Sequence, residues 1–376
     1  MVFNKNDQNY RQCSISVMDN IADPDITFDE KGICNYYYEY QEIASKTLKT
    51  NEEATNYFNH IIETIKKDGV GKDYDCILGV SGGVDSTYLA YIAKQAGLKV
   101  LCVHFDNGWN SELAVKNIEN IVTKCGFQLY TYVIDWNEFK DIQKSYFKAH
   151  VIDIEAITDI AIFSALDILC QQFKIKHIID GRNVVTESIL PPSWICKNAS
   201  NLKHIHEKFG SVPLKSYPLM LPIRRRIVAK TKPFTSWPLL NYVSYIKSDA
   251  KKIIQAQLGW RDYGGKHYES IFTRFYQGFI LPEKFKVDKR KAHLSNLIYS
   301  GQITKEEAVQ ELNQPIYPVE FFRTDYDLVL KKLGFTNEQF ETYLQQAQVP
   351  HQNYNMSFSI FDEYPVLKPF KKLFKK

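Results

Sequence analysis

The six residues Ser81 to Ser86, SGGVDS, have the types and spacing of a loop that binds phosphate groups. Gly82 and Gly83 let the backbone approach a ligand closely, and backbone N–H groups at the start of a helix attract anions. The hydroxyls of Ser81 and Ser86 add donors, whereas the carboxylate of Asp85 would repel a phosphate unless Mg²⁺ lay between them. An ordinary strand-to-helix turn with a Ser or Asp cap is the simpler alternative. We favour a pyrophosphate site made by Ser81, Gly82, Gly83, Val84, Asp85 and Ser86.

Two other short segments are expected to lie beside this loop. Asp106 and Asn107 follow the apolar run VLCVHF, and Gly181, Arg182 and Asn183 follow the apolar run HIID. We expect all five residues to line the same crevice as the SGGVDS loop, where the charge of Arg182 would meet a phosphate. The Asp-Asn-Gly sequence is also favourable turn chemistry by itself.

The elements that must hold these residues form a regular pattern from residue 74 onward. Apolar runs such as DCILGV, KVLCVHF and QLYTYVID alternate with helical segments such as STYLAYIAKQAG. This order predicts an α/β domain with a doubly wound parallel sheet, in which ligands bind at the carboxyl ends of the strands. Further helices are expected near residues 137–149 and 158–174, before a strand at 177–181.

The whole chain divides into four expected parts. Residues 1–45 contain short alternating runs such as DITFDEKG and ICNYYYEY, which predict a small β appendage. Residues 46–73 predict a linking helix, and residues 74–235 form the α/β domain. Residues 236–376 predict a mostly helical region that binds a substrate or partner, with helices near 238–258, 303–313 and 336–347.

The composition is typical of an ordinary globular protein. The 376 residues are 44% hydrophobic and 24% charged, as in ordinary globular chains, and a net charge of +4 does not by itself indicate nucleic-acid binding. The seven cysteines are odd in number and widely spaced, as in reduced intracellular proteins. Because no apolar stretch has the length of a membrane span or a signal peptide, we expect a cytoplasmic protein with no transmembrane segment.

The motifs narrow the nucleotide chemistry. The GVGK segment at 69–72 lacks the spacing of a Walker A loop, and no GxGxxG sequence follows a strand. SGGVDS instead resembles the pyrophosphate loop of the ATP pyrophosphatase superfamily, whose members include GMP synthetase, NAD synthetase, asparagine synthetase and tRNA thiolation enzymes. The resemblance implies ATP and Mg²⁺ as cofactors and cleavage of ATP between its α and β phosphates. It also implies catalytic roles for Ser81 and Asp85, the latter holding Mg²⁺ through ATP.

A second group of candidate residues lies in the run from 261 to 308, which is dense in cations and aromatic residues. As anion ligands it offers Lys266, His267, Arg274, Lys284, Lys286, Arg290 and His293, with Glu269 and Asp288 as partners. From the charge pattern alone, a solvated, salt-bridged helical surface is the more common explanation.

A resemblance to a known family favours anion binding by these residues. GGKHYES, FTRF, KFKVDKRKAHLS and SGQIT, with VMDNIADPDITFDEKGICNYY near the start, resemble the N-acetyl sugar amidotransferase family over about residues 10–315. The resemblance implies ATP-dependent conversion of an N-acetyl group to an acetamidino group through an adenylated intermediate, with release of AMP and pyrophosphate. The acceptor would be an acetamido sugar acid, free or linked to UDP or CMP, in the synthesis of lipopolysaccharide O-antigen, another surface polysaccharide or a flagellar glycan. We assign the sugar-binding role to Lys266, His267, Glu269, Arg274, Lys284 and Arg290, with Lys266 and His267 also catalytic.

The sequence departs from this family in its N-terminal appendage. Related chains carry two CxxC pairs there, typical of a zinc ribbon, whereas the corresponding positions here are Cys13, Ser16, Cys34 and Tyr37. Because two of the four thiolates are missing, we expect no zinc. The appendage is expected to be held instead by packing of Tyr36, Tyr37, Tyr38 and Tyr40.

The nitrogen donor is expected to be a separate protein. The chain starts Met1-Val2 and has no GxCxG nucleophile elbow, so the sequence offers no glutaminase nucleophile. The resemblance implies ammonia from a glutaminase subunit, with a channel-forming cyclase-like partner. From the low net charge we expect no nucleic-acid partner. Two alternatives stay open. One is a tRNA thiolation enzyme, against which count the missing catalytic CxxC and the low net charge, and the other is a noncatalytic nucleotide-binding scaffold in a glycan-synthesis complex.

Overall fold

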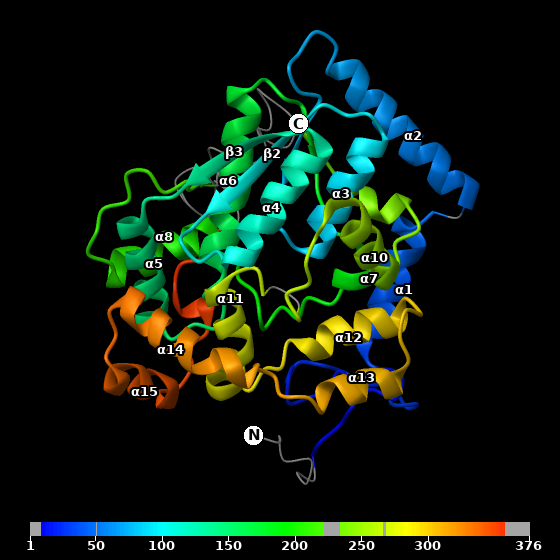
Figure 1. The fold of residues 1–376 in the computed structure, drawn as a ribbon. Helices are drawn as coiled ribbons and strands as arrows, with labels where there is room; N and C mark the ends of the chain where they lie inside the picture. The colour runs from blue at the N-terminus through cyan, green and yellow to red at the C-terminus, as the bar shows by residue number, and fades with distance from the viewer. Residues whose placement is uncertain (1–8, 50, 222–233, 266–267, 358–376) are drawn as a thin grey trace, which may run out of the picture.

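Five parallel strands form the central sheet of the protein, seen in a computed structural model that describes residues 9–49, 51–221, 234–265 and 268–357 (Figure 1). The strands are β1 Cys76–Gly79, β2 Val100–Asp106, β3 Gln128–Val133, β4 His177–Ile179 and β5 Thr235–Trp237, in the order β3-β2-β1-β4-β5. In the register of the sheet, Cys76 pairs with Val100 on one side of β1, and Ile77 pairs with Ile178 on the other. The strand order reverses between β1 and β4, so their carboxyl ends form the switch point of a doubly wound sheet. The predicted fold class is confirmed.

Helices cover both faces of the sheet, because successive strand residues point to opposite sides. One face packs against α2 Asn51–Asp68, α3 Val84–Gln95, α4 Glu112–Cys125 and α10 Lys247–Leu258. On this face Leu78 and Cys102 are completely buried. The other face packs against α6 Ala156–Gln172, whose Leu166 and Leu169 share a core with Ile77 of β1.

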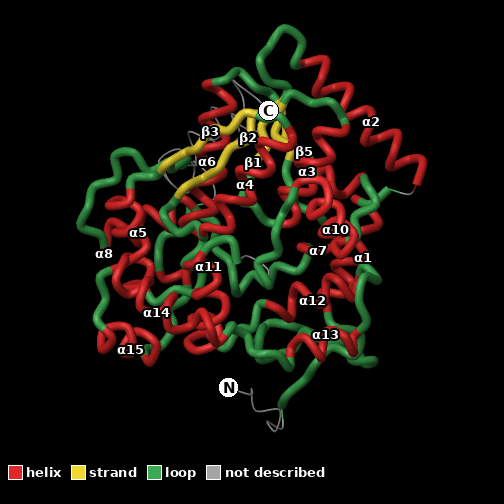
Figure 2. Tube along the Cα trace, in the orientation of Figure 1, coloured by secondary structure: helices red, strands yellow, loops and turns green. Residues whose placement is uncertain are grey.

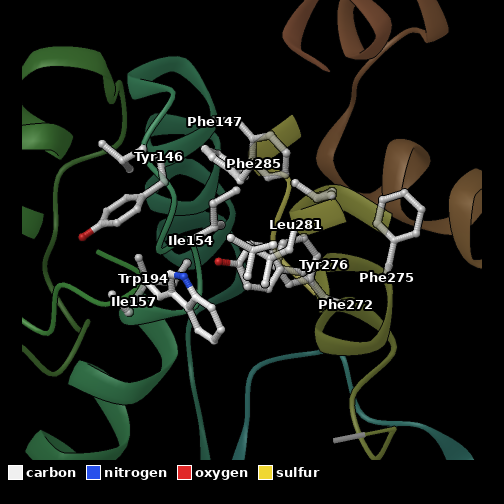
Figure 3. Close-up of a cluster of buried hydrophobic side chains, with 14 of the residues drawn as sticks. Tyr146, Phe147, Ile154, Ile157, Trp194, Phe272, Phe275, Tyr276, Leu281 and Phe285 are labelled. Carbon is white, nitrogen blue, oxygen red and sulfur yellow. The ribbon is translucent and has the colours of Figure 1, made fainter. Parts of the chain in front are cut away.

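The 3₁₀ turn η1 Leu239–Tyr242 also packs on the first face, beside α2 and α10. Most of the other helices lie on the side where the strands end (Figures 1 and 2). They are α5 Trp136–Ala149, α7 Val184–Glu187, α8 Ala199–Phe209, α11 Ile271–Phe275, the π-helix η2 Tyr276–Phe285, α12 Arg290–Tyr299, α13 Lys305–Leu312, α14 Val319–Leu333, α15 Asn337–Gln345 and the 3₁₀ turn η3 His351–Asn353. Figure 3 shows the apolar cluster that joins the two halves of the chain: Phe147 of α5 and Ile157 of α6 lie in one core with Phe272 and Tyr276. This cluster fixes the C-terminal helices beside the sheet.

The N-terminal part differs from the expected β appendage. Its strand pairing is limited, in the described residues, to the bridges Gln12–Asp19 and Phe28–Cys34, and NYYYEY belongs to α1 Asn35–Thr47. The prediction of strands there is wrong. Aromatic residues favour strands, but here the buried rings of Tyr36 and Tyr40 are four residues apart, which is the spacing of one helix face.

The tyrosines of α1 pack largely as expected. The rings of Tyr37 and Tyr40 lie 5.4 Å and 5.6 Å from the ring of Tyr299 on α12. Tyr38 is the exception, because it is 49% exposed, although its hydroxyl donates to Asp29 at 2.7 Å.

The proposed boundary at 235/236 falls inside β5, and the next elements, η1 and α10, share a core with α3. The four-part division of the chain stays a prediction. No helix in the described ranges is long and apolar enough to cross a membrane.

Candidate nucleotide site at the switch point

The SGGVDS loop connects the end of β1 to the start of α3 at the switch point. Gly82 has a φ of +82°, a conformation that glycine adopts without strain, and Gly83 is the N-cap of α3. The backbone N–H of Gly83 donates to the hydroxyl of Ser81 at 3.2 Å, and this hydroxyl lies 3.4 Å from the hydroxyl of Ser86. Two hydroxyls and a helix N-terminus therefore meet at one point, which is the arrangement that binds a phosphate.

Two aromatic side chains from the segment after α10 hold the loop by hydrogen bonds. The indole N–H of Trp260 and the hydroxyl of Tyr263 donate to the carbonyl oxygen of Gly82, at 2.7 Å and 2.9 Å. A Cβ atom at residue 82 would lie 2.7 Å from the Tyr263 oxygen, so the close approach requires glycine. Sequence reasoning missed both residues. The available signal was a Trp and a Tyr three positions apart in the turn after α10.

Asp85 lies in the first turn of α3, and the hydroxyl of Tyr245 donates to its carboxylate. Burial, together with the negative charge of Asp85, raises the pKa of Tyr245 far above its usual value, so Tyr245 remains a donor. The Gln302 side chain donates to the backbone carbonyl of Tyr245 at 3.3 Å and fixes it. Like Trp260 and Tyr263, Tyr245 was not among the site residues predicted from the sequence.

Gly181, at the end of β4, reaches the loop as the sequence suggested. A Cβ atom at this position would lie 3.3 Å from the Cβ of Asp85 and 3.4 Å from the backbone nitrogen of Ser86. The carboxyl ends of β1 and β4 therefore touch. A side chain at residue 181 would therefore require Asp85 or the start of α3 to shift by a few tenths of an ångström.

The other residues at the end of β4 have partners of their own. The Arg182 guanidinium binds both carboxylate oxygens of Asp180, at 2.9 Å and 2.8 Å, and this bond raises the pKa of Arg182. Asn183 is buried, and its side-chain oxygen accepts from the backbone N–H of Thr186 at 2.9 Å as the N-cap of α7. A nucleotide-binding role for these two residues stays a prediction.

The end of β2 forms a hydrogen-bonded turn. Asp106 accepts from the backbone N–H of Gly108 at 2.9 Å and from the side chain of Asn110 at 3.0 Å. Asn107 is buried, accepts from the backbone N–H of Trp109 at 3.2 Å and donates to Thr158 at 3.3 Å. These contacts match the turn chemistry considered as the alternative, and a nucleotide-binding role stays a prediction for Asp106 and Asn107.

A C-terminal segment lies along the same loop. The backbone N–H of Ser111 donates to the carbonyl of Glu269 at 2.9 Å, and the N–H of Ile271 donates to the carbonyl of Trp109 at 2.8 Å. This pairing places a carboxylate oxygen of Glu269 3.5 Å from the position that a Cβ of Gly83 would occupy. Among the proposed sugar ligands, Glu269 therefore lies against the phosphate loop. Lys266 and His267 lie outside the described residues.

The remaining proposed sugar ligands make contacts within the protein. Arg274 binds both carboxylate oxygens of Asp325, at 2.7 Å and 2.9 Å. Lys284 donates to the carbonyl oxygens of Tyr343, at 2.6 Å, and Gln346 near the end of α15. Arg290 binds Asp288 and the last carbonyls of α13. These contacts favour structural roles for the three cations, and their assignment to the sugar stays a prediction.

The metal chemistry of the site depends on few protein ligands. Within the described ranges no group of three or more His, Cys, Asp or Glu side chains gathers in a way that could hold a metal ion. Asp85 in the first turn of α3, with the hydroxyls of Ser81 and Ser86 in the same loop, fits Mg²⁺ that is bound mainly by phosphate oxygens and water.

The degenerate zinc-ribbon positions converge on one tyrosine. The hydroxyl of Tyr299 lies 2.8 Å from the Ser16 hydroxyl and 3.2 Å from the Cys34 sulfur, and the backbone N–H of Cys34 donates to the Cys13 sulfur at 3.3 Å. Hydrogen bonding to Cys34 lowers the pKa of Cys13 to about 4. These positions are thus joined by hydrogen bonds, and the absence of zinc stays a prediction.

Comparison with known proteins gives two matching family models. Residues 75–218 match the family of the queuosine biosynthesis protein QueC, and residues 269–365 match the C-terminal domain of the WbpG-like LPS biosynthesis proteins. The first match covers β1, the SGGVDS loop and β4. The second begins at Glu269, the residue that lies against Gly83.

The individual proteins that match are similar over a short segment or at low sequence identity. The chain is 37% identical over 71 residues to tRNA(Ile)-lysidine synthase from Chlamydia pneumoniae, a match to 18% of this chain and 22% of that protein. The structure of NMN synthetase from Francisella tularensis covers 71% of this chain and 98% of its own, at 12% identity and a TM-score of 0.36, too low to support a conclusion. The SGGVDS loop and the matched families together place the chain in the ATP pyrophosphatase superfamily, with a C-terminal part like that of the WbpG-like LPS biosynthesis proteins.

Proposed function

We propose that the protein is an ATP-dependent amidotransferase that converts the N-acetyl group of an acetamido sugar to an acetamidino group, in the synthesis of a bacterial surface polysaccharide. One observation carries the proposal. The segment that matches the WbpG-like family begins at the residue that touches the phosphate loop, so the part of the chain related to polysaccharide synthesis borders the nucleotide site.

In this proposal the loop binds the β and γ phosphates of ATP. The Ser81 and Ser86 hydroxyls and the N-terminus of α3 supply donors, while Asp85 binds Mg²⁺, which neutralises phosphate charge. Trp260 and Tyr263 keep the Gly82 carbonyl turned toward the protein, so that the backbone N–H groups of the loop remain directed at the phosphates. Catalysis is then mainly a matter of positioning and of stabilising developing charge.

The acceptor reacts in two steps. The acetamido oxygen attacks the α phosphate, pyrophosphate leaves, and an O-adenylated imidate forms. Ammonia then adds at the imidate carbon and AMP departs with the oxygen. We expect the ammonia to come from a separate glutaminase subunit with a channel-forming partner, and the sugar to be bound by Lys266, His267 and Glu269.

The test is pyrophosphate release from Mg²⁺-ATP with ammonium chloride and a panel of free, UDP-linked and CMP-linked acetamido sugars, followed by mass spectrometry of the sugar. The expected result is sugar-dependent release with replacement of one oxygen by NH. Glutamine should not replace ammonium salts with the purified chain alone. Absence of release with every sugar, while ATP still binds, would contradict the proposal and favour a noncatalytic scaffold.

A tRNA-modifying enzyme is the second candidate, because the 71-residue match is to a tRNA(Ile)-lysidine synthase. The same assay with unmodified tRNA as acceptor tests it. We expect no pyrophosphate release with tRNA, since the net charge of +4 is small for a protein that binds a polyanion.

A further inference from the structure

A partly buried carboxylate, Glu155, has no role in the site described so far. It precedes α6, and one of its oxygens accepts a hydrogen bond from the hydroxyl of Thr273 at 2.7 Å. The other oxygen has no hydrogen-bond partner among the residues that the structure describes, and the residue as a whole is only partly buried. The carboxylate is therefore fixed in orientation and still able to contact a small ligand.

Both neighbours of Glu155 belong to elements that border the phosphate loop. Thr158, in the first turn of α6, contacts Asn107 at the end of β2. Thr273 lies on α11, which begins two residues after Glu269, and Glu269 contacts Gly83 of the loop. Through these residues Glu155 is linked to the end of β2 on one side and to the segment that matches the WbpG-like family on the other.

The surroundings of Glu155 are mixed. Ile154 and Ile157 pack into the apolar cluster of Figure 3 together with Phe272 and Tyr276. The charges of Asp159, Asp153 and Lys289 affect the pKa of Glu155 directly. Lys197 forms an ion pair with Asp159 at 2.8 Å. Burial, with the negative charges of Asp159 and Asp153, raises the pKa of Glu155 to about 7, although the Thr273 hydrogen bond and Lys289 oppose the rise. A carboxyl group of this kind can exchange a proton near neutral pH.

We propose that Glu155 is the general base that binds ammonium and removes its proton before the nitrogen attacks the activated sugar. This inference rests on the proposed amidotransferase function and names the group that handles the nucleophile. Thr273 acts as a positioning residue, because its hydrogen bond holds one carboxylate oxygen and leaves the other oxygen for the ligand.

The proton and electron changes balance. Ammonium and the Glu155 carboxylate become ammonia and a carboxylic acid. The lone pair of ammonia forms the new C–N bond at the imidate carbon, and the C–O bond breaks with its electron pair leaving on AMP. The amidine product keeps all three protons of the ammonia and is a cation, the acetamido N–H proton having been released when the imidate formed.

The experiment compares wild-type protein, Glu155→Gln and the exposed control Glu63→Gln in two assays. The first is sugar-dependent exchange of labelled pyrophosphate into ATP, which reports adenylation alone. The second is amidine formation from ammonium chloride, measured by mass spectrometry. We expect Glu155→Gln to retain exchange and to lose amidine formation by about 100-fold at pH 8, a usual contribution of a general base. The control should match wild type in both assays.

Two further readouts distinguish a base from a structural residue. Hydroxylamine is already uncharged at neutral pH and needs no deprotonation, so it should restore most of the rate of Glu155→Gln. The ratio of wild-type to Glu155→Gln rates cancels the pH dependence of free ammonia, and it should rise with pH and level off above about pH 7. Thr273→Val removes a hydrogen bond that lowers the pKa of Glu155, and should move this levelling to higher pH.

Each outcome decides between the two proposals. No sugar-dependent exchange in wild-type protein would contradict the amidotransferase function itself. Exchange in wild type, with equal amidine formation by Glu155→Gln, would overturn the role of Glu155 only. Loss of exchange in Glu155→Gln with ATP binding intact would also overturn it, because the residue would then serve adenylation. If Glu155→Gln does not fold, the ratio of wild-type to Thr273→Val rates replaces it, since this ratio also cancels the pH dependence of free ammonia, and a ratio that does not change with pH is the contradicting result.

Discussion

The indole nitrogen of Trp260 lies 2.7 Å from the carbonyl oxygen of Gly82, 178 residues earlier in the chain. This hydrogen bond, with that of Tyr263 to the same oxygen, joins the C-terminal half of the chain directly to the phosphate loop. The nucleotide site is therefore shaped by residues outside the segment that carries its motif.

Replacing Trp260 by Phe removes one of the two donors to the Gly82 carbonyl. Because a neutral hydrogen bond contributes about 1 kcal/mol, ATP affinity should fall about fivefold, measured by titration calorimetry. Trp237→Phe is the matched control, since its indole donates to His177 on the sheet instead. Equal losses in the two variants would show that the Gly82 contact has no special effect on ATP.

Replacing Gly82 by Ala should abolish ATP binding. The new Cβ would lie 2.7 Å from the Tyr263 oxygen and 3.0 Å from the Ala114 carbonyl, so the loop must move. Gly71→Ala separates this clash from backbone strain, because Gly71 has a similar φ of +74° with no atom within 4 Å of the new Cβ. It should cost about 1–2 kcal/mol of unfolding free energy and leave ATP binding intact. ATP binding by Gly82→Ala at the wild-type affinity is the contradicting result.

Tyr245→Phe should raise the Mg²⁺ concentration needed for half-maximal activity three- to tenfold. The variant loses the hydroxyl that orients the Asp85 carboxylate, and the carboxylate then spends less time in the position that meets the cation. Tyr242→Phe, a neighbour on η1 whose ring contacts Tyr57, serves as the control. A lower Mg²⁺ requirement would mean instead that the Tyr245 hydroxyl competes with the cation.

Arg274→Met should destabilise the fold by about 3–5 kcal/mol, the usual cost of leaving one buried charge without its partner. The side chains of Arg274 and Asp325 are only 11% and 4% exposed. Arg323→Met, which breaks an exposed pair with Asp327, should change stability by less than about 1 kcal/mol. Denaturant unfolding measures both. A large rise in the KM for sugar without loss of stability would indicate instead that Arg274 binds the sugar.

Asp153 gives the protein a pH-dependent stability. Burial raises its pKa from 3.8 to about 6, although the backbone N–H of Cys196 donates to it at 2.7 Å. The folded state therefore holds a proton that the unfolded state has released between these values, so the contribution of this group to stability falls as pH rises from about 4 to about 6. Relative to wild type, Asp153→Asn should gain up to about 3 kcal/mol over this interval, at about 1.4 kcal/mol per pKa unit. Unfolding curves at several pH values test this, and a constant difference would contradict it.

The α/β core could be predicted because its signal is local. Buried strands such as Cys76–Gly79 are continuous apolar runs, and each is followed by a segment of helical spacing. β5 Thr235–Trp237 lacked such a signal, since it is three residues long and two of them are exposed. The tyrosine run after Cys34 misled the prediction, because the strand propensity of aromatic rings outweighed the four-residue spacing that α1 uses.

The candidate site also contains residues that the sequence predicts and residues that it does not. The residues of the SGGVDS loop are contiguous, so their types predict a phosphate site without knowledge of the fold. Trp260, Tyr263 and Tyr245 act on the loop across more than a hundred residues, and two of them bind a backbone carbonyl, which has no sequence signature. The partners of the cations in the C-terminal run could not be predicted for a related reason. A charge pattern does not reveal that Arg274 has Asp325 as its buried partner 51 residues away.

The long separation between Gly82 and Trp260 also sets an order of events during synthesis. The ribosome delivers Gly82 178 residues before Trp260, which at 5–20 residues per second is an interval of roughly 10–35 s. During that time the nascent α/β segment has its glycine-rich turn but lacks the two donors that fix the Gly82 carbonyl. A growing chain therefore completes the hydrogen bonds that fix this loop only after residues 260–263 have been synthesised.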